Sequence, residues 1–177
     1  VTMNSNQLPI NEYSKFNATY IQALENVELF EELEISLHDF IRFVQNIPLD
    51  KFDYSYAAGK WTIKEIIQHI IDTERIFAYR ALRISRNDKT PLPGFEENSY
   101  VENTSAKARS IQDLLTEFSA VRHSNLLMFK SFSDEQLRRV GIASDHEISV
   151  RAIGFILLGH LKHHQKDHYY RPILQDE

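Results

Sequence analysis

The chain holds eight histidines and no cysteine, and four of the histidines lie between positions 160 and 168. Residues four apart lie one turn apart on the same face of an α-helix. His160 and His164 can therefore direct one ring nitrogen each at a single cation. Because no thiolate is present, a metal ion here would be bound by histidine and carboxylate side chains alone.

The apolar residues around these histidines indicate which ones point inward. At about 100° per residue, His164 falls within about 25° of the centre of the apolar stripe and His160 within about 65°. His163 lies more than about 120° away, which places it at the edge of the fold or against a partner subunit. His168 extends the inner face by one turn, so a His164/His168 pair is a competing register. The stripe itself consists of Val150, Ile153, Leu157 and Leu161.

Two interpretations of the inward pair remain open on spacing alone. The histidines either bind a metal ion or are hydrogen-bonded residues of the core or surface. A zinc-protease HExxH motif is excluded, because Leu161 stands where that motif requires glutamate.

A third ligand is needed for a stable site, and His69 is the natural candidate. It lies among isoleucines in a predicted helix that begins with a capping box formed by Thr62 and Glu65. Glu65 either serves only that cap or accepts a hydrogen bond from the ring nitrogen of His69 that does not bind metal. Three neutral histidines would leave a dication with an open position, where either a water or a thiolate can be activated.

The elements that must position these residues are helical almost throughout. Apolar residues recur at three- and four-residue steps in four long segments, which predicts an all-α four-helix bundle. The long helices are expected at residues 27–44, 62–85, 105–132 and 149–173, with weaker or shorter helices at 10–24 and 133–140. Loops are expected at 49–60, 87–103 and 142–148, the second long enough to cross one end of a bundle. Residues 1–8 are expected to be a flexible tail, followed by a single domain at 9–177.

Two stretches around the histidines carry a family resemblance. The chain resembles the DinB/YfiT-like superfamily in its WT-x-x-E-x-x-x-H pattern at residues 61–69 and its GH-x-x-HH pattern at residues 159–164. Residues 91–98 also resemble the loop after the second helix of these proteins.

The resemblance implies an up-down-down-up four-helix bundle with the long crossover between the second and third helices. It implies a divalent metal, nickel or zinc, bound by His69, His160 and His164. Relatives with assigned activity are mainly transferases or isomerases that use low-molecular-weight thiols such as bacillithiol or mycothiol. Others are described as metal-dependent hydrolases, and homodimers are common among them.

We therefore expect a metal-dependent enzyme that transfers a thiol or hydrolyses a small-molecule substrate, with thiol transfer favoured by the relatives. Arg80, on the His69 side of its helix, either contacts an anionic substrate group or makes a structural ion pair. One alternative is a non-catalytic dimeric bundle with a structural or sensory metal. Another is a metal-free bundle whose histidines pack at an interface, in which case His163 should be the sensitive position.

Composition bounds the partners. The net charge of −5 disfavours binding to a nucleic-acid backbone. No stretch approaches the roughly 18 apolar residues of a membrane span. The first residues lack the pattern of a secretion signal. We expect a cytoplasmic protein that binds neither nucleic acid nor membrane.

Overall fold

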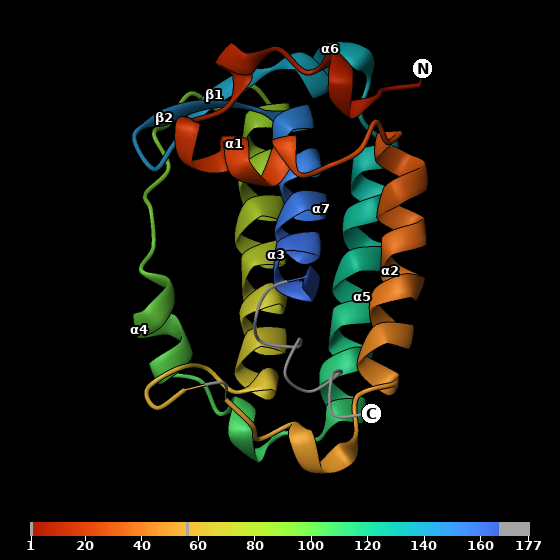
Figure 1. Cartoon of the computed structure of the whole chain (residues 1–177). Coiled ribbons are helices and arrows are strands. Elements are labelled where there is room, and N and C mark those ends of the chain that lie inside the picture. The colour runs from red at the N-terminus through yellow and green to blue at the C-terminus, as the bar shows by residue number, and fades with distance from the viewer. Residues whose placement is uncertain (1, 56, 167–177) are drawn as a thin grey trace.

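The computed structural model describes residues 2–55 and 57–166. Four long helices run side by side: α2 (Leu29–Gln45), α3 (Ile63–Ser85), α5 (Ile111–Lys130) and α7 (Val150–Lys166). In Figure 1, α2 and α7 run downward while α3 and α5 run upward. This is the up-down-down-up order predicted from the family resemblance. The connection from α3 to α5 descends along the outside of the bundle and carries α4 (Glu97–Glu102).

The bounds of the long helices follow from their caps. Thr62 accepts a hydrogen bond from the Glu65 amide, and the Glu65 carboxylate accepts one from the Thr62 amide at 2.7 Å. This capping box starts α3 where the sequence predicted. The third long helix starts later than the predicted 105, because Ser110 caps α5 and residues 106–108 form a separate 3-10 turn.

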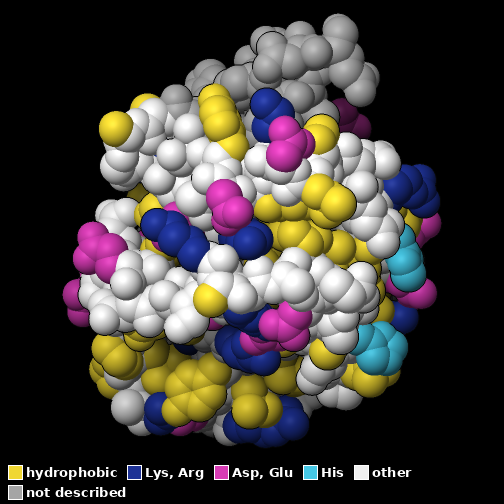
Figure 2. All heavy atoms as spheres, turned by 90° about the horizontal axis from the view of Figure 1, so that it is seen from below, with side chains coloured by type: hydrophobic (Ala, Val, Ile, Leu, Met, Phe, Trp, Pro, Cys, Tyr) yellow, Lys and Arg dark blue, Asp and Glu magenta, His cyan; other side chains and the backbone are white. Residues whose placement is uncertain are grey.

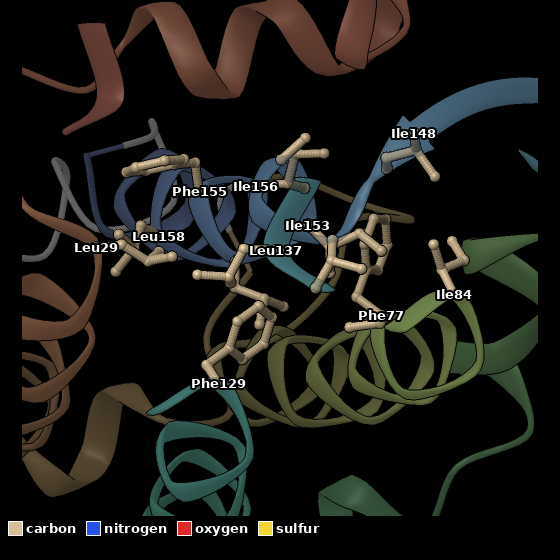
Figure 3. Packing of buried hydrophobic residues seen from close by; sticks show 14 of the residues in the cluster. Leu29, Phe77, Ile84, Phe129, Leu137, Ile148, Ile153, Phe155, Ile156 and Leu158 are labelled. Carbon is tan, nitrogen blue, oxygen red and sulfur yellow. The ribbon is translucent and has the colours of Figure 1, made fainter. Parts of the chain in front are cut away.

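Apolar side chains from all four long helices fill the core. One cluster surrounds α7, and a second lies between α2, α3 and α5. In Figure 3, Phe77 of α3 and Phe129 of α5 point toward α7 near Ile153, and Ile84 of α3 lies on the side of Ile148. Leu137, from the short helix α6 (Asp134–Arg138), lies beside Phe129 in the same cluster.

The core also contains a charged network. Arg122 on α5 is fully buried and forms an ion pair with Glu74 on α3. Glu74 also accepts a hydrogen bond from Asn125 at 2.8 Å, and Arg122 donates one to Ser36 at 2.7 Å. This buried network connects α2, α3 and α5 through hydrogen bonds and one ion pair.

A hairpin replaces the polar loop predicted at 142–148. Strands β1 (Val140–Ala143) and β2 (His146–Ser149) pair antiparallel, with Ala143 opposite His146. Ser144 and Asp145 form the turn with φ of 51° and 64°, the left-handed conformation that two-residue hairpin turns favour. The prediction was wrong because one short strand gives little periodic signal. The backbone of Leu92, far away in the sequence, also pairs with this hairpin.

The N-terminal segment differs from the expected flexible tail. Met3 is 3% exposed, and the Ser5 amide donates to the Val27 carbonyl at 2.9 Å. Residues 2–8 therefore pack across one end of the bundle (Figure 1). The helix expected at 10–24 is divided into a 3-10 turn (Ile10–Glu12) and α1 (Lys15–Gln22).

Among the described residues, no helix combines the length and apolarity needed to cross a membrane. Seen from the lower end of the bundle, acidic and basic side chains are interspersed with apolar ones (Figure 2).

Candidate metal centre

Three histidines from two helices meet in the interior of the bundle. His69 Nε2 lies 2.9 Å from His160 Nε2, which lies 3.1 Å from His164 Nε2. One ring nitrogen from each of the three lies within 4.8 Å of the others. Their exposed fractions are 3%, 4% and 7%. The structure thus brings together the three residues that the sequence singled out.

The packing of α3 along α7 explains this meeting. His160 and His164 share the buried face of α7 with Leu161 as neighbour, as their spacing predicted. His163 is exposed, in agreement with its predicted position away from that face. His168, the residue of the competing register, lies outside the described residues.

Aromatic rings pack against the three imidazoles. Trp61 lies 4.8 Å from the ring of His69, between centroids, and Tyr20 lies 5.5 Å from the ring of His160 and 5.4 Å from that of His163. Tyr20 was not among the residues expected at the site. Gly159 was the one sequence feature that could have indicated a close contact here. A Cβ at this position would lie 2.2 Å from the Tyr20 carbonyl oxygen, so only glycine lets α1 come this close to α7.

Burial keeps all three imidazoles neutral. It lowers the pKa of His69 from 6.5 to about 4 and is the main cause that lowers the pKa of His164 to about 3. The pKa of His160 falls well below 6.5, first through burial and then through the adjacent His164 and His69. Neutral imidazoles are the form that binds metal.

Two of the three separations between these nitrogens are compatible with ligands of one divalent cation. Two nitrogens bound at about 2.1 Å lie about 3.0 Å apart at a right angle and about 3.4 Å apart at a tetrahedral angle. The separations of 2.9 and 3.1 Å lie close to the first value. Ring nitrogens this close repel one another if neither carries a proton and no cation lies between them, and the tautomer of each histidine decides which nitrogen donates.

Two polar residues one helical turn from His69, Glu65 before it and Thr73 after it, differ in whether their side chains have hydrogen-bond partners. Glu65 completes the capping box and pairs with Lys107 at 3.4 Å, so the structure shows its capping role. Thr73, one turn after His69, is 2% exposed, and its hydroxyl has no hydrogen-bond partner among the described residues. A buried hydroxyl without a partner is unusual, and here it lies on the same helix as the candidate ligand.

Arg80 makes no ion pair in the part of the chain that the structure describes. Its guanidinium donates hydrogen bonds to the Pro93 carbonyl at 3.0 Å and to the Ser144 hydroxyl at 3.1 Å. Of the two roles predicted for Arg80, the structural ion pair is therefore not found among these residues.

The fold and the three-histidine cluster define a four-helix-bundle protein with a candidate metal centre. The DinB superfamily model matches residues 32–167, which include all three histidines. The chain therefore belongs to the DinB superfamily, as its two motifs predicted.

Individual relatives are distant. A protein of Bacillus cereus (strain G9842), named as a putative metal-dependent hydrolase, is 19% identical over 106 residues, which are 59% of this chain and 60% of that protein. The match thus spans less than two thirds of this curated relative.

Two solved structures share the fold. YfiT from Bacillus subtilis, a probable metal-dependent hydrolase with an unusual four-helix bundle topology, superposes with a TM-score of 0.68 at 16% identity. The superposition covers 89% of this chain and 87% of YfiT. A mycothiol-dependent maleylpyruvate isomerase superposes with a TM-score of 0.63 at 12% identity, covering 93% of this chain and 62% of that one. The four-helix bundle predicted from the sequence is confirmed.

Proposed function

We propose that this chain is a metal-dependent enzyme in which His69, His160 and His164 bind one divalent cation, nickel or zinc. The observation that carries the proposal is the convergence of three buried ring nitrogens, two pairs of them 2.9 and 3.1 Å apart. Membership of the DinB superfamily, whose matched relatives include proteins named for metal-dependent hydrolysis, supports it.

A divalent cation bound by three imidazoles supplies an open position at which a water or a thiol loses its proton near neutral pH. The chain's own residues prepare that position. Burial keeps the imidazoles neutral, and the rings of Trp61 and Tyr20 restrict the orientation of His69 and His160. The Thr73 hydroxyl is available to hydrogen-bond a group that binds beside His69.

We propose transfer of a low-molecular-weight thiol as the leading reaction and hydrolysis as the second. One structural neighbour is named as a mycothiol-dependent isomerase, which supports thiol chemistry. Two other relatives are named as a "putative" and a "probable" metal-dependent hydrolase, which supports activation of water. Incubating the metal-loaded protein with a thiol and an electrophile, and separately with ester substrates, distinguishes conjugation from hydrolysis by mass spectrometry.

The first experiment measures metal content, in protein purified without a metal-affinity column. Wild type is expected to contain about one divalent ion per chain, and His160→Ala to contain almost none. His163→Ala is the matched control, because it removes an exposed histidine from the same helix and should retain the metal. Wild-type protein that neither contains nor takes up nickel or zinc, while remaining folded, would overturn the proposal.

A non-catalytic bundle with a structural or sensory metal is the second candidate, and the deep burial of all three rings favours it. Cobalt substitution separates the two. An open position should admit an added thiol and change the visible absorption of the cobalt protein, whereas a site closed by a fourth protein ligand should not. The homodimer, the cytoplasmic location and the lack of nucleic-acid binding stay predictions.

A further inference from the structure

A cavity of about 470 Å³ lies beside α3, away from the three histidines. Its walls come from the start of α1, from α3, from residues 95–97 and from the β1–β2 hairpin. Phe77 and Ile148, both labelled at one edge of the core in Figure 3, line it together with Phe95. Its volume is within the range of small-molecule sites.

Arg80 is the buried charge in this cavity. Its exposed fraction is 5%, and burial lowers the pKa of its guanidinium. Both of its hydrogen bonds to protein come from Nη2, and no carboxylate pairs with it among the described residues. A buried guanidinium normally pairs with a carboxylate, and Arg80 has no such partner among the described residues. Its Nε and Nη1 atoms can therefore still donate hydrogen bonds to a ligand.

Aromatic rings flank this guanidinium. The Arg80 Cζ atom lies 4.9 Å from the ring centroid of Phe77 and 5.9 Å from that of Phe95. Such rings hold the planar group in place and offer apolar surface to the body of a ligand. With Nη2 bonded to Pro93 and Ser144, Nε and Nη1 can each donate a single hydrogen bond to a carboxylate oxygen.

Acidic side chains line the same cavity and restrict the charge of the ligand. Glu96 and Glu147 are exposed, whereas Glu97 is partly buried, and burial raises the pKa of its carboxyl group. They would repel a ligand that carries several negative charges. They would attract an ammonium group on a ligand whose carboxylate reaches Arg80.

We propose that this cavity binds a small zwitterionic carboxylate, with the carboxylate on Arg80, an apolar body against Phe77 and Phe95, and the ammonium group toward Glu97. The site goes beyond the proposed metal chemistry and does not depend on it.

Two elements connect the cavity with the three-histidine cluster. Arg80 follows His69 by eleven residues, which places it about 20° away around α3 and about 16 Å along its axis. Phe16 and Asn17 of α1 line the cavity, and Tyr20, one turn further along α1, contacts His160. α1 therefore contacts both the cavity and the three-histidine cluster, so a ligand in the cavity would lie against the helix that also packs on the cluster.

The test uses three related probes on the full chain, with and without metal: L-phenylalanine, 3-phenylpropionate and L-phenylalaninamide. Phenylalanine should cause saturable amide NMR shifts at residues that line the cavity. Phenylalaninamide, which lacks the carboxylate, should bind at least about tenfold more weakly. 3-Phenylpropionate, which lacks the ammonium group, should lie between them.

Two variants and one control complete the design. Arg80→Gln should weaken both carboxylate probes by at least about tenfold. Arg83→Gln is the matched control, because Arg83 lies one turn along α3, pairs with Asp88 and does not line the cavity. Glu97→Gln should reduce the preference for phenylalanine over 3-phenylpropionate about twofold to fivefold. It also tests the proposal if Arg80→Gln does not fold.

The proposal is overturned if phenylalaninamide binds as tightly as phenylalanine, or if folded Arg80→Gln binds like wild type. It is also overturned if none of the probes gives saturable shifts at the cavity up to about 10 mM. Binding to metal-free protein, or to protein that never takes up metal, supports the cavity site even if the metal proposal fails.

Discussion

Acidification of the metal-free protein should selectively destabilise the fold through the three-histidine cluster. The perturbation is a change from pH 7 to pH 5 after treatment with a chelator. Burial holds the pKa of His69 at about 4 and, with its neighbours, that of His164 at about 3, whereas both have ordinary values of 6.5. The unfolded chain therefore binds more protons than the folded chain between pH 6.5 and the folded-state pKa values.

The sign follows from linkage. Stability falls as the pH decreases through 6.5, and the loss is complete below the folded-state pKa of each histidine. For His69, the difference between 6.5 and about 4 lowers the free energy of unfolding by about 2 kcal/mol between pH 7 and pH 5. His164 contributes a loss of similar size. No reduction for solvent screening is needed, because the two side chains are 3% and 7% exposed.

Urea unfolding followed by circular dichroism at the two pH values measures this loss. His69→Asn removes one of the titrating groups, so its acid-induced loss should be smaller by about 2 kcal/mol. His38→Gln is the control, because His38 is exposed and should leave the loss unchanged. Burial raises the pKa of Asp72 and Glu97, but these carboxylates are the same in the wild type and in both variants, so their contribution cancels in the comparison.

Equal free energies of unfolding at pH 7 and pH 5 would refute the reasoning. So would a loss in His69→Asn as large as that in wild type, because the neutral burial of His69 would then not be its source. Saturating nickel or zinc should protect the wild type at pH 7, by about 2.7 kcal/mol at a hundred times the dissociation constant.

Three further predictions concern the elements that position the cluster. Glu74→Gln should lower the free energy of unfolding by about 3–5 kcal/mol, because it leaves Arg122 buried without its partner charge; a loss under about 1 kcal/mol in urea unfolding would contradict this. Gly159→Ala should cost about 1–3 kcal/mol in the same assay, because its Cβ would lie 2.2 Å from the Tyr20 carbonyl oxygen; wild-type stability would show that α1 does not pack so closely. Thr62→Ala should cost about 1 kcal/mol, seen as a lower melting temperature in calorimetry, and an unchanged value would show that the cap contributes nothing.

Local patterns in the sequence were sufficient for the helices and for much of the cluster. Helical periodicity and helix caps depend only on residues close together in the sequence. The start of α3 at the capping box of Thr62 could therefore be predicted. The spacing of His160 and His164 fixed their common face, because neighbouring turns of one helix are in register. His69 was the candidate third ligand from its place among isoleucines in a predicted helix, and the family resemblance implied the same residue. The structure places its ring beside the other two.

Contacts between distant segments were decided only by the tertiary structure. Helical periodicity shows which face is buried but not which side chain lies opposite, so the pairing of Arg122 with Glu74 could not be read from the sequence. The hairpin was missed because each of its two four-residue strands has almost no periodic signal. Leu92, which also pairs with the hairpin, lies about fifty residues away from it in the sequence. The position of Tyr20 over His160 depends on a close approach that Gly159 permits but does not specify. Likewise, no local pattern shows that Arg80 lacks a carboxylate partner among the described residues. Its surroundings depend on how α3, residues 93–97 and the hairpin pack together.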